Sequence, residues 1–127
     1  MATLSRLTLT LKQTPTQQAL KVVDLTYGYT LTCTEVECAR TISFDVSVDI
    51  LGDDLVGDDL LATAVDRHIV ECGATHLAPI EMRRNFVVGQ SLLDEDVGTD
   101  EIKLRVWARD SSGGEIFAVT GIVRGDF

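Results

Sequence analysis

The sequence predicts an all-β fold, a single antiparallel β-sandwich of about six or seven strands with immunoglobulin-like or related topology. Several runs alternate apolar and polar residues with the two-residue period of a strand that buries one face. Turn-forming residues separate these runs at short intervals, and no regular alternation of strands with long helices indicates a parallel sheet. The 127 residues have the length of one ordinary domain, so we expect residues 1–127 to form one sandwich.

The first two strands follow from simple alternation. Leu7–Leu11 alternates leucine with threonine and is expected to be half-buried. Residues 13–18 form a polar loop, because Pro15 prevents the strand from continuing. Val23–Cys33 keeps its apolar residues on one parity and is the second strand, in which Gly28 indicates a bulge.

The middle of the chain contains clear strands and one ambiguous segment. Ile42–Ile50 alternates apolar residues with serine and aspartate, and it forms a hairpin with the preceding strand across Thr34–Glu37. Leu60–Cys72 has apolar residues at helical spacing, yet it also contains β-branched residues that favour a strand. We predict a strand there, with a short helix as the alternative. Leu77–Val88 is a further strand, and Gln90–Asp100 is a long loop.

The clearest pattern is the predicted hairpin Glu101–Val123. Its first half alternates strictly, Ser111–Gly114 supplies residues that tolerate positive φ, and Ile116–Val123 returns as the second strand. The returning strand is apolar on both parities. We therefore expect cover on both of its faces, either from this chain or from a second copy.

The chain is strongly acidic. It has 11 basic and 20 acidic residues, and the formal net charge of -9 repels phosphate backbones and anionic lipids at long range. We predict neither a nucleic-acid nor a membrane partner, since no run approaches the roughly 20 apolar residues of a membrane span. The absence of a signal-peptide pattern and the odd number of cysteines, 3, favour a cytoplasmic protein.

Acidic loops are expected to meet at one end of the sandwich. If each element crosses the domain once, successive connections alternate between its two ends, which places residues 13–18, 52–59 and 89–101 together. Carboxylate oxygens from two of these loops are the ligands that Ca²⁺ prefers. The candidate calcium ligands are Asp54, Asp58, Asp94 and Asp96. The main expectation is that these are solvated acids that keep strand ends apart, and no other cofactor is expected.

The opposite end collects the cysteines. The candidate zinc ligands there are Cys33, Cys38, Cys72 and His76. The spacings differ from the usual C-x2-C pattern, and cysteine is among the most buried residue types. Ordinary core thiols are therefore the main expectation, and a Cys33–Cys38 disulfide and a zinc site are the alternatives.

No catalytic motif is present. Gly89-Gln90-Ser91 lacks the closing glycine of a nucleophile elbow, and there is no glycine-rich phosphate loop. His68 and Cys72 are four residues apart, but they share a face only if that segment is helical. We therefore predict a protein that is not an enzyme.

Trp107, the only tryptophan, is a stronger functional candidate, as a binding residue, than any of these catalytic candidates. Strand alternation places it on the outward face with Lys103, Arg105 and Arg109. Three explanations remain open. The ring packs under a neighbouring loop or strand, it contacts an acidic surface of another copy, or it stacks on a ligand such as a sugar.

These observations predict a small acidic structural or protein-interaction module without catalytic activity that associates with itself. The alternative is a calcium-assisted module that binds carbohydrate or protein through the acidic loops at one end of the sandwich.

Overall fold

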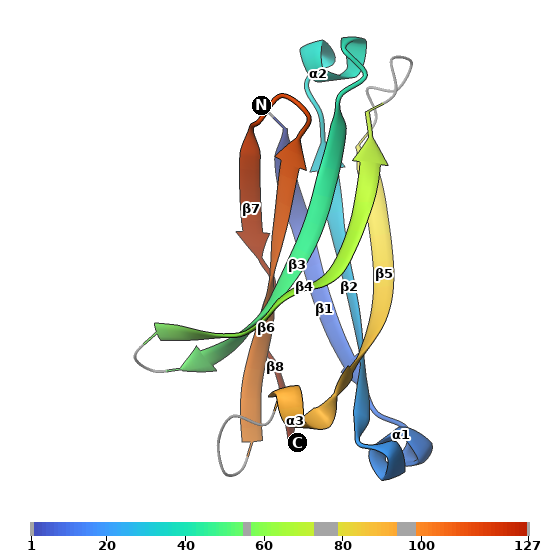
Figure 1. Cartoon of the computed structure of the whole chain (residues 1–127), viewed down its shortest axis with the longest axis vertical. Helices are drawn as coiled ribbons and strands as arrows, with labels where there is room; N and C mark the ends of the chain where they lie inside the picture. The colour runs from blue at the N-terminus through green and yellow to red at the C-terminus, as the bar shows by residue number, and fades with distance from the viewer. Residues whose placement is uncertain (1, 55–56, 73–78, 94–98, 127) are drawn as a thin grey trace.

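The described residues of the chain form eight strands in two antiparallel sheets that face each other (Figure 1). The computed structural model describes residues 2–54, 57–72, 79–93 and 99–126. One sheet has the strand order β1-β2-β5, and the other has the order β4-β3-β6-β7 with β8 also paired to β6. The strands are β1 Thr3–Lys12, β2 Val22–Thr32, β3 Ser43–Asp54, β4 Gly57–Glu71, β5 Ile80–Gly89, β6 Thr99–Asp110, β7 Glu115–Val119 and β8 Val123–Asp126. The predicted all-β fold is thus confirmed.

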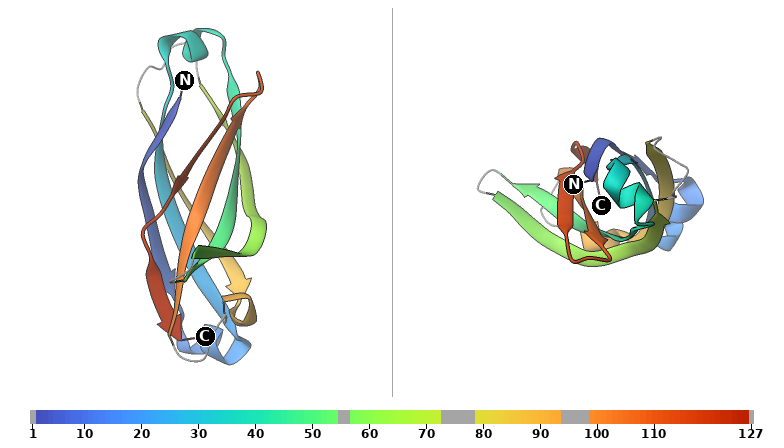
Figure 2. Two further views of the ribbon diagram at one scale, coloured as in Figure 1. Left: turned by 90° about the vertical axis from the view of Figure 1, so that its left-hand side faces the viewer. Right: turned by 90° about the horizontal axis from the view of Figure 1, so that it is seen from above.

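Three short helices lie at the two ends of the sheets. They are α1 (Pro15–Leu20), α2 (Glu35–Ala39) and α3 (Gln90–Leu93). Figure 1 shows α2 at one end and α1 with α3 at the other, and Figure 2 shows the same arrangement from the side and from above. A hydrogen bond from Gln13 Nε2 to Gln90 Oε1 at 2.9 Å joins two connections that were expected to share an end.

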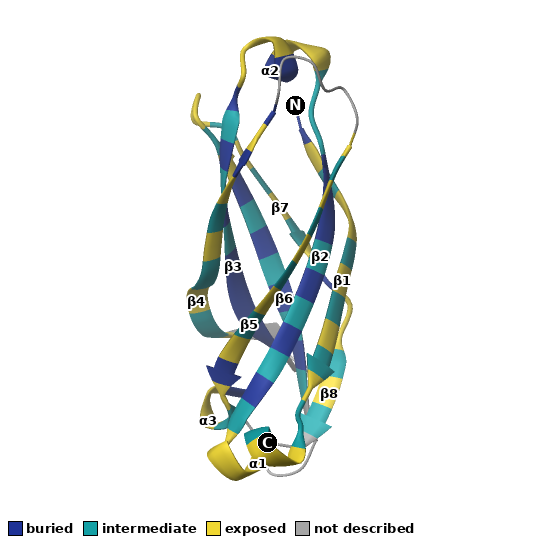
Figure 3. Ribbon diagram, turned by 90° about the vertical axis from the view of Figure 1, so that its right-hand side faces the viewer, coloured by how far each residue is buried: buried dark blue, intermediate teal, exposed yellow. Residues whose placement is uncertain are grey.

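The core comes from one face of each sheet. β3 and β6 contribute Val46, Val48, Ile50, Leu104, Val106 and Ala108, all with no exposed surface, and β2 contributes Val23, Leu25, Tyr27 and Leu31. The alternation of buried and partly exposed residues along these strands is visible as bands in Figure 3. The period of two in the sequence therefore corresponds to the two faces of each sheet.

The helices correct three predicted connections, since α1 and α2 occupy the first two and α3 occupies the start of the predicted loop Gln90–Asp100. Thr14 and Thr34 each form a capping box, in which the threonine side chain accepts from the backbone of the third helical residue and that residue's side chain accepts from the threonine N–H. Pro15 sits at the start of α1, where its missing N–H costs nothing. The interpretation of Pro15 as a simple strand breaker was therefore incomplete.

The segment Leu60–Cys72 is not helical. Its residues up to Glu71 belong to β4, which pairs with β3 from Ser43↔Glu71 to Asp54↔Gly57. The short-helix alternative was wrong, because pairing along the whole of β3 outweighs the local helical spacing. Two shifts of register interrupt this ladder, between Val48 and Leu51.

Gly28 lies opposite a bulge that is on the neighbouring strand. The β1–β2 register shifts between Ser5 and Thr8, and Thr8 then pairs with Gly28. A Cβ at position 28 would lie 2.9 Å from Thr8 Oγ1 and 3.3 Å from the Met82 carbonyl oxygen. Glycine is thus required for close approach, and the bulge itself belongs to β1 rather than β2.

The predicted second strand of the last hairpin is broken in two. β7 pairs with β6 up to Arg105↔Val119, and β8 resumes at Ile102↔Val123. At the break, the buried Thr120 hydroxyl accepts a hydrogen bond from the Leu104 N–H at 2.9 Å, and the Thr120 N–H donates to the Leu104 carbonyl at 2.9 Å. The Thr120 side chain therefore takes the place of the backbone acceptor that a regular neighbouring strand would offer to the Leu104 N–H.

We expect Thr120→Val to lower the free energy of unfolding by about 1–3 kcal/mol, because the buried Leu104 N–H loses its acceptor while the side-chain volume is kept. Urea unfolding measures the change. Thr120→Ser keeps the hydroxyl and is the control; a Val variant as stable as the Ser variant would contradict the assigned hydrogen bond.

Candidate functional site

The outward face of the five-stranded sheet carries an ordered array of polar and aromatic side chains. Three rows cross β3, β6 and β7: Asp45–Arg109–Glu115, Ser47–Trp107–Phe117 and Asp49–Arg105–Val119. These residues alternate with the buried core residues of the same strands. The sequence expectation that Trp107, Arg105 and Arg109 share this face agrees with the register.

Asp49 is the centre of this array. Its Oδ2 accepts from Trp107 Nε1 at 2.8 Å and from the Arg105 guanidinium at 3.0 and 3.3 Å. Its Oδ1 accepts from the Ala64 N–H at 3.0 Å. The carboxylate thus has donors from two neighbouring strands, and its side chain is only 10% exposed.

The irregular part of β4 supplies the backbone donor. The register shifts leave more residues on β4 than on β3 at this point, and Ala64 adopts a φ of 49°. A residue displaced in this way has no ladder partner for its N–H, and the Asp49 carboxylate takes that place. The bulge therefore redirects a backbone donor to the sheet's outward face.

Burial on its own raises the pKa of the Asp49 carboxyl, but the hydrogen bonds from Ala64, Arg105 and Trp107 outweigh it. The net effect is a pKa below the ordinary value for aspartate. Asp49 is therefore charged at neutral pH and cannot act as a general acid there.

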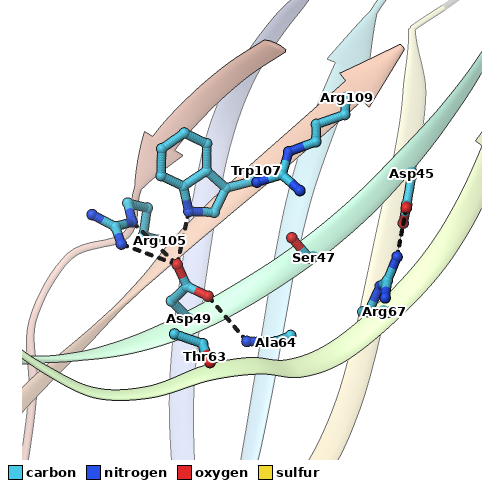
Figure 4. Close-up of a pocket in the computed structure, with 9 residues that line it drawn as sticks. All are labelled: Asp45, Ser47, Asp49, Thr63, Ala64, Arg67, Arg105, Trp107 and Arg109. Carbon is cyan, nitrogen blue, oxygen red and sulfur yellow. Dashed lines mark hydrogen bonds and ion pairs between the residues drawn. The ribbon is translucent and has the colours of Figure 1, made fainter. Parts of the chain in front are cut away.

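A cavity of about 340 Å³ opens beside Asp49, between the bend of β4 and the strands β3 and β6 (Figure 4). Its lining consists of Asp45, Ser47, Asp49, Thr63, Ala64, Arg67, Arg105, Trp107 and Arg109. Figure 4 shows Asp49 between Trp107 and Arg105, and Arg67 turned toward Asp45. The cavity is polar, and each of its three guanidinium groups, those of Arg67, Arg105 and Arg109, already contacts a carboxylate of the protein.

Trp107 is half-buried rather than fully exposed. Its ring lies 4.7 Å from the Phe117 ring, between centroids, and the Arg105 guanidinium carbon lies 4.8 Å from the Trp107 centroid. These contacts favour the first of the three explanations, packing against a neighbouring strand. Arg109 pairs with Glu115 at 2.6 Å, and Lys103 lies opposite Leu51 in the ladder. A binding role for the four residues stays a prediction.

The calcium prediction concerns residues whose side chains lie outside the described part of the structure. Asp94 and Asp96 fall outside the described residues altogether. Asp54 and Asp58 are described only as backbone, near the end of the β3–β4 ladder. The calcium site therefore stays a prediction.

The cysteines do come together. The Sγ atoms of Cys33, Cys38 and Cys72 all lie within 4.8 Å of one another, and Cys33 is bonded to Cys72. The main expectation of ordinary thiols was therefore wrong for Cys33 and Cys72, and so was the alternative Cys33–Cys38 disulfide, because the bond joins the ends of β2 and β4 in different sheets. His76, the fourth residue of the zinc alternative, lies outside the described residues.

A second polar cluster, which sequence reasoning missed, lies between β4 and β5. Tyr27 donates to Asp66 Oδ2 at 2.6 Å, and Arg84 Nε donates to the same oxygen at 2.7 Å. Tyr29 is hydrogen-bonded through its hydroxyl to His68 Nε2. The residues come from β2, β4 and β5, so only the three-dimensional pairing reveals the cluster.

Burial governs the titration of this cluster. It raises the pKa of both tyrosines and, together with the Arg84 charge, lowers the pKa of the His68 imidazole. His68 Nδ1 is buried without a hydrogen-bond partner among the described residues. A neutral imidazole is therefore favoured, although Asp66 and Asp45 partly oppose this effect.

Comparisons with known proteins add little to this geometry. No protein-family model matches the sequence, and no curated protein matches it significantly. A crystal structure of a Bordetella pertussis protein provisionally called ApaA aligns with a TM-score of 0.44 at 9% identity, covering 97% of this chain and 92% of that chain. The structural genomics target SoR45 aligns with a TM-score of 0.41 at 9% identity, covering 94% of this chain and 83% of that chain. Neither description states an activity.

The Asp49 cluster predicts an unequal effect of two neighbouring substitutions. Asp49→Asn should lower the free energy of unfolding at neutral pH by about 1.5–3 kcal/mol, because charged hydrogen bonds in a shielded site are lost. Asp45→Asn removes the exposed pair with Arg67 and should cost no more than about 0.5 kcal/mol.

The pH dependence checks the charge of Asp49. Its folded pKa is lowered, so its contribution is complete above the unfolded pKa of about 3.9 and is lost as pH falls through the folded pKa. The gap in urea midpoint between wild type and Asp49→Asn should close over that acidic range. A gap that is independent of pH would contradict the assignment.

His68 gives a separate prediction near neutral pH. Because its folded pKa is lowered, the unfolded chain binds the proton more readily, and stability should fall as pH drops below the unfolded pKa of about 6.5. His68→Gln should flatten the slope of unfolding free energy against pH, measured by urea unfolding. His76→Gln, which changes the other histidine of the chain, should leave that slope unchanged. Equal slopes in wild type and His68→Gln would be inconsistent with the lowered pKa.

Proposed function

We propose that this protein is a non-catalytic interaction module that pairs with a second copy of itself along β7. The observation that carries the proposal is an edge strand with an uncovered apolar face. β7 ends the order β4-β3-β6-β7, so one of its two edges has no partner strand among the described residues. Phe117, Val119 and Ile122 on and after this strand are 59%, 40% and 46% exposed.

Two other edge strands, β4 and β5, are better protected. β4 bends at its bulge and carries Asp66 and Arg67, and β5 carries Glu81, Arg83 and Arg84. Charges and bulges of this kind are the usual means by which edge strands avoid pairing with another chain. β7 has the sequence EIFAV, with Glu115 as its only charge. An apolar edge without such protection is suited to strand addition.

A second copy fits this edge by symmetry and by charge. Antiparallel pairing of β7 with itself is two-fold symmetric, and in the register centred on β7 Phe117 meets Phe117 and each Trp107–Phe117 contact adjoins its counterpart. Although the chain carries a net charge of -9, Glu115 is already paired with Arg109 and Asp49 with Arg105. These ion pairs reduce the repulsion between two copies at this face.

Other functions receive less support from the described residues. The arginines of the cavity beside Asp49 contact carboxylates, which disfavours capture of an anion. None of the helices in the described ranges has the length and apolar character needed to cross a membrane.

Sedimentation equilibrium tests the proposal. Wild type should be a dimer at micromolar concentration, and Phe117→Lys should be a monomer, because a charge on each copy would face its twin across the two-fold axis. Val87→Lys, at a residue of β5 that is 54% exposed, is the matched control and should remain dimeric.

Salt provides an independent check. Raising the ionic strength from about 10 to about 150 mM shortens the screening length from about 30 to about 8 Å, so association of two acidic copies should tighten. A monomeric wild type at both ionic strengths, or equal loss of the dimer in the Phe117 and Val87 variants, would refute pairing along β7.

A further inference from the structure

The three cysteines form a cluster that neither the fold nor the proposed pairing explains. Cys33 follows β2, Cys38 lies in α2 and Cys72 follows β4, so three separate elements deliver one sulfur each. Together they account for every cysteine of the chain. Cys38 and Cys72 are buried at 2% and 0% exposure, whereas Cys33 is half-buried.

A structural disulfide needs two of these sulfurs, not three. The Cys33–Cys72 bond already links the two sheets across a sequence separation of 39 residues. The third sulfur lies within 4.8 Å of both bonded sulfurs, so that reduction would leave three sulfur ligands close enough to bind one metal ion. Thiolates are the ligands that thiophilic d10 ions prefer, and Zn²⁺ in such sites has Zn–S bonds of about 2.3 Å.

We propose that reduction of the Cys33–Cys72 bond converts this cluster into a binding site for a thiophilic d10 cation, with Zn²⁺ as the model ion. The bond thereby controls whether the metal site exists. Ligand sulfurs bound to one ion at about 2.3 Å in tetrahedral geometry lie about 3.8 Å apart, within the span the three Sγ atoms already occupy.

The chemistry balances without an unnamed reagent. A dithiol reductant attacks the Cys33–Cys72 bond by thiol–disulfide exchange, becomes a disulfide itself and leaves two protein thiols. With Cys38 there are then three thiols, and binding of one Zn²⁺ as a trithiolate releases three protons. A fourth coordination position is open to water. Half-buried Cys33 provides the side from which the ion enters.

Cadmium titration of the whole chain tests the site. Cd²⁺ is a d10 thiophilic probe whose thiolate complexes absorb in the near ultraviolet. The phosphine-reduced protein should show this absorption and saturate with one ion, and native mass spectrometry should give one Cd²⁺ bound with loss of three protons. Cd²⁺ should also replace Zn²⁺ in protein loaded with Zn²⁺ beforehand, because the softer ion binds thiolates more tightly. The oxidised protein should show none, because its bonded sulfurs are not thiolates.

Two variants locate the third ligand. Cys38→Ser should weaken Cd²⁺ binding by more than about tenfold, the range in which even outer partners of metal ligands act. Ala39→Ser, at an exposed residue of the same helix, should bind like wild type. No thiolate absorption in the reduced wild type, or equal affinity in the Cys38 and Ala39 variants, would overturn the proposal. If Cys38→Ser fails to fold, the proton count of the wild-type complex decides alone: loss of two protons refutes the trithiolate.

Discussion

The register between β3 and β6 is the constraint on which the remainder of the structure depends. Val48 pairs with Val106, and both are completely buried, while the next pair, Asp49 with Arg105, faces outward. Because side chains alternate with a period of two, a slip of one residue would bury the charged pair and expose the valines. Burying two charges costs several kcal/mol per ion before their attraction is counted. The core and the outward array therefore follow from one choice of register.

The two open sides of the sandwich are treated differently. On one side the edge strands β4 and β5 are bridged by hydrogen bonds that involve Asp66, Arg84 and the two tyrosines of β2. The polar side chains at this water-accessible side are thus bonded to one another. On the other side the short β7 lies beside β1 and presents Phe117, which is 59% exposed, outward next to the Trp107 ring. An apolar edge that is left uncovered costs solubility, and this asymmetry is the physical basis for assigning a partner to β7.

The fold class could be predicted from the sequence because alternation is local. The strand over Ile42–Ile50 and the outward position of Trp107 needed only the period of two. Two helices were missed although a threonine with Gln or Glu three residues later marks each start, since strand patterns on both sides dominated the interpretation. The break in the last strand also had a local indication, Gly121.

The candidate sites could not be predicted in the same way. The donors around Asp49 come from Arg105, Trp107 and a bulge at Ala64. Neither the pairing of β3 with β6 nor the bulge in β4 produces a recognisable spacing of residues in the sequence. The Cys33–Cys72 bond crosses between sheets, whereas the nearer Cys38 was the natural partner in sequence. Sequence reasoning nevertheless placed all three cysteines at one end, because strand crossings alternate between ends whatever their order. The order of strand crossings thus predicted that the cysteines lie near one another, but only the structure shows which two are bonded.

Helix α2 connects the cysteine cluster to the rest of that end. It has five residues, too few to be stable without its contacts. Beside Cys38, the buried Glu37 carboxylate accepts from Thr34 N at 2.8 Å and from Ala2 N at 3.2 Å, which ties the helix to the start of β1. Because so short a helix depends on such anchors, the Glu37 carboxylate fixes the position of α2, and with it that of Cys38 near the other two sulfurs.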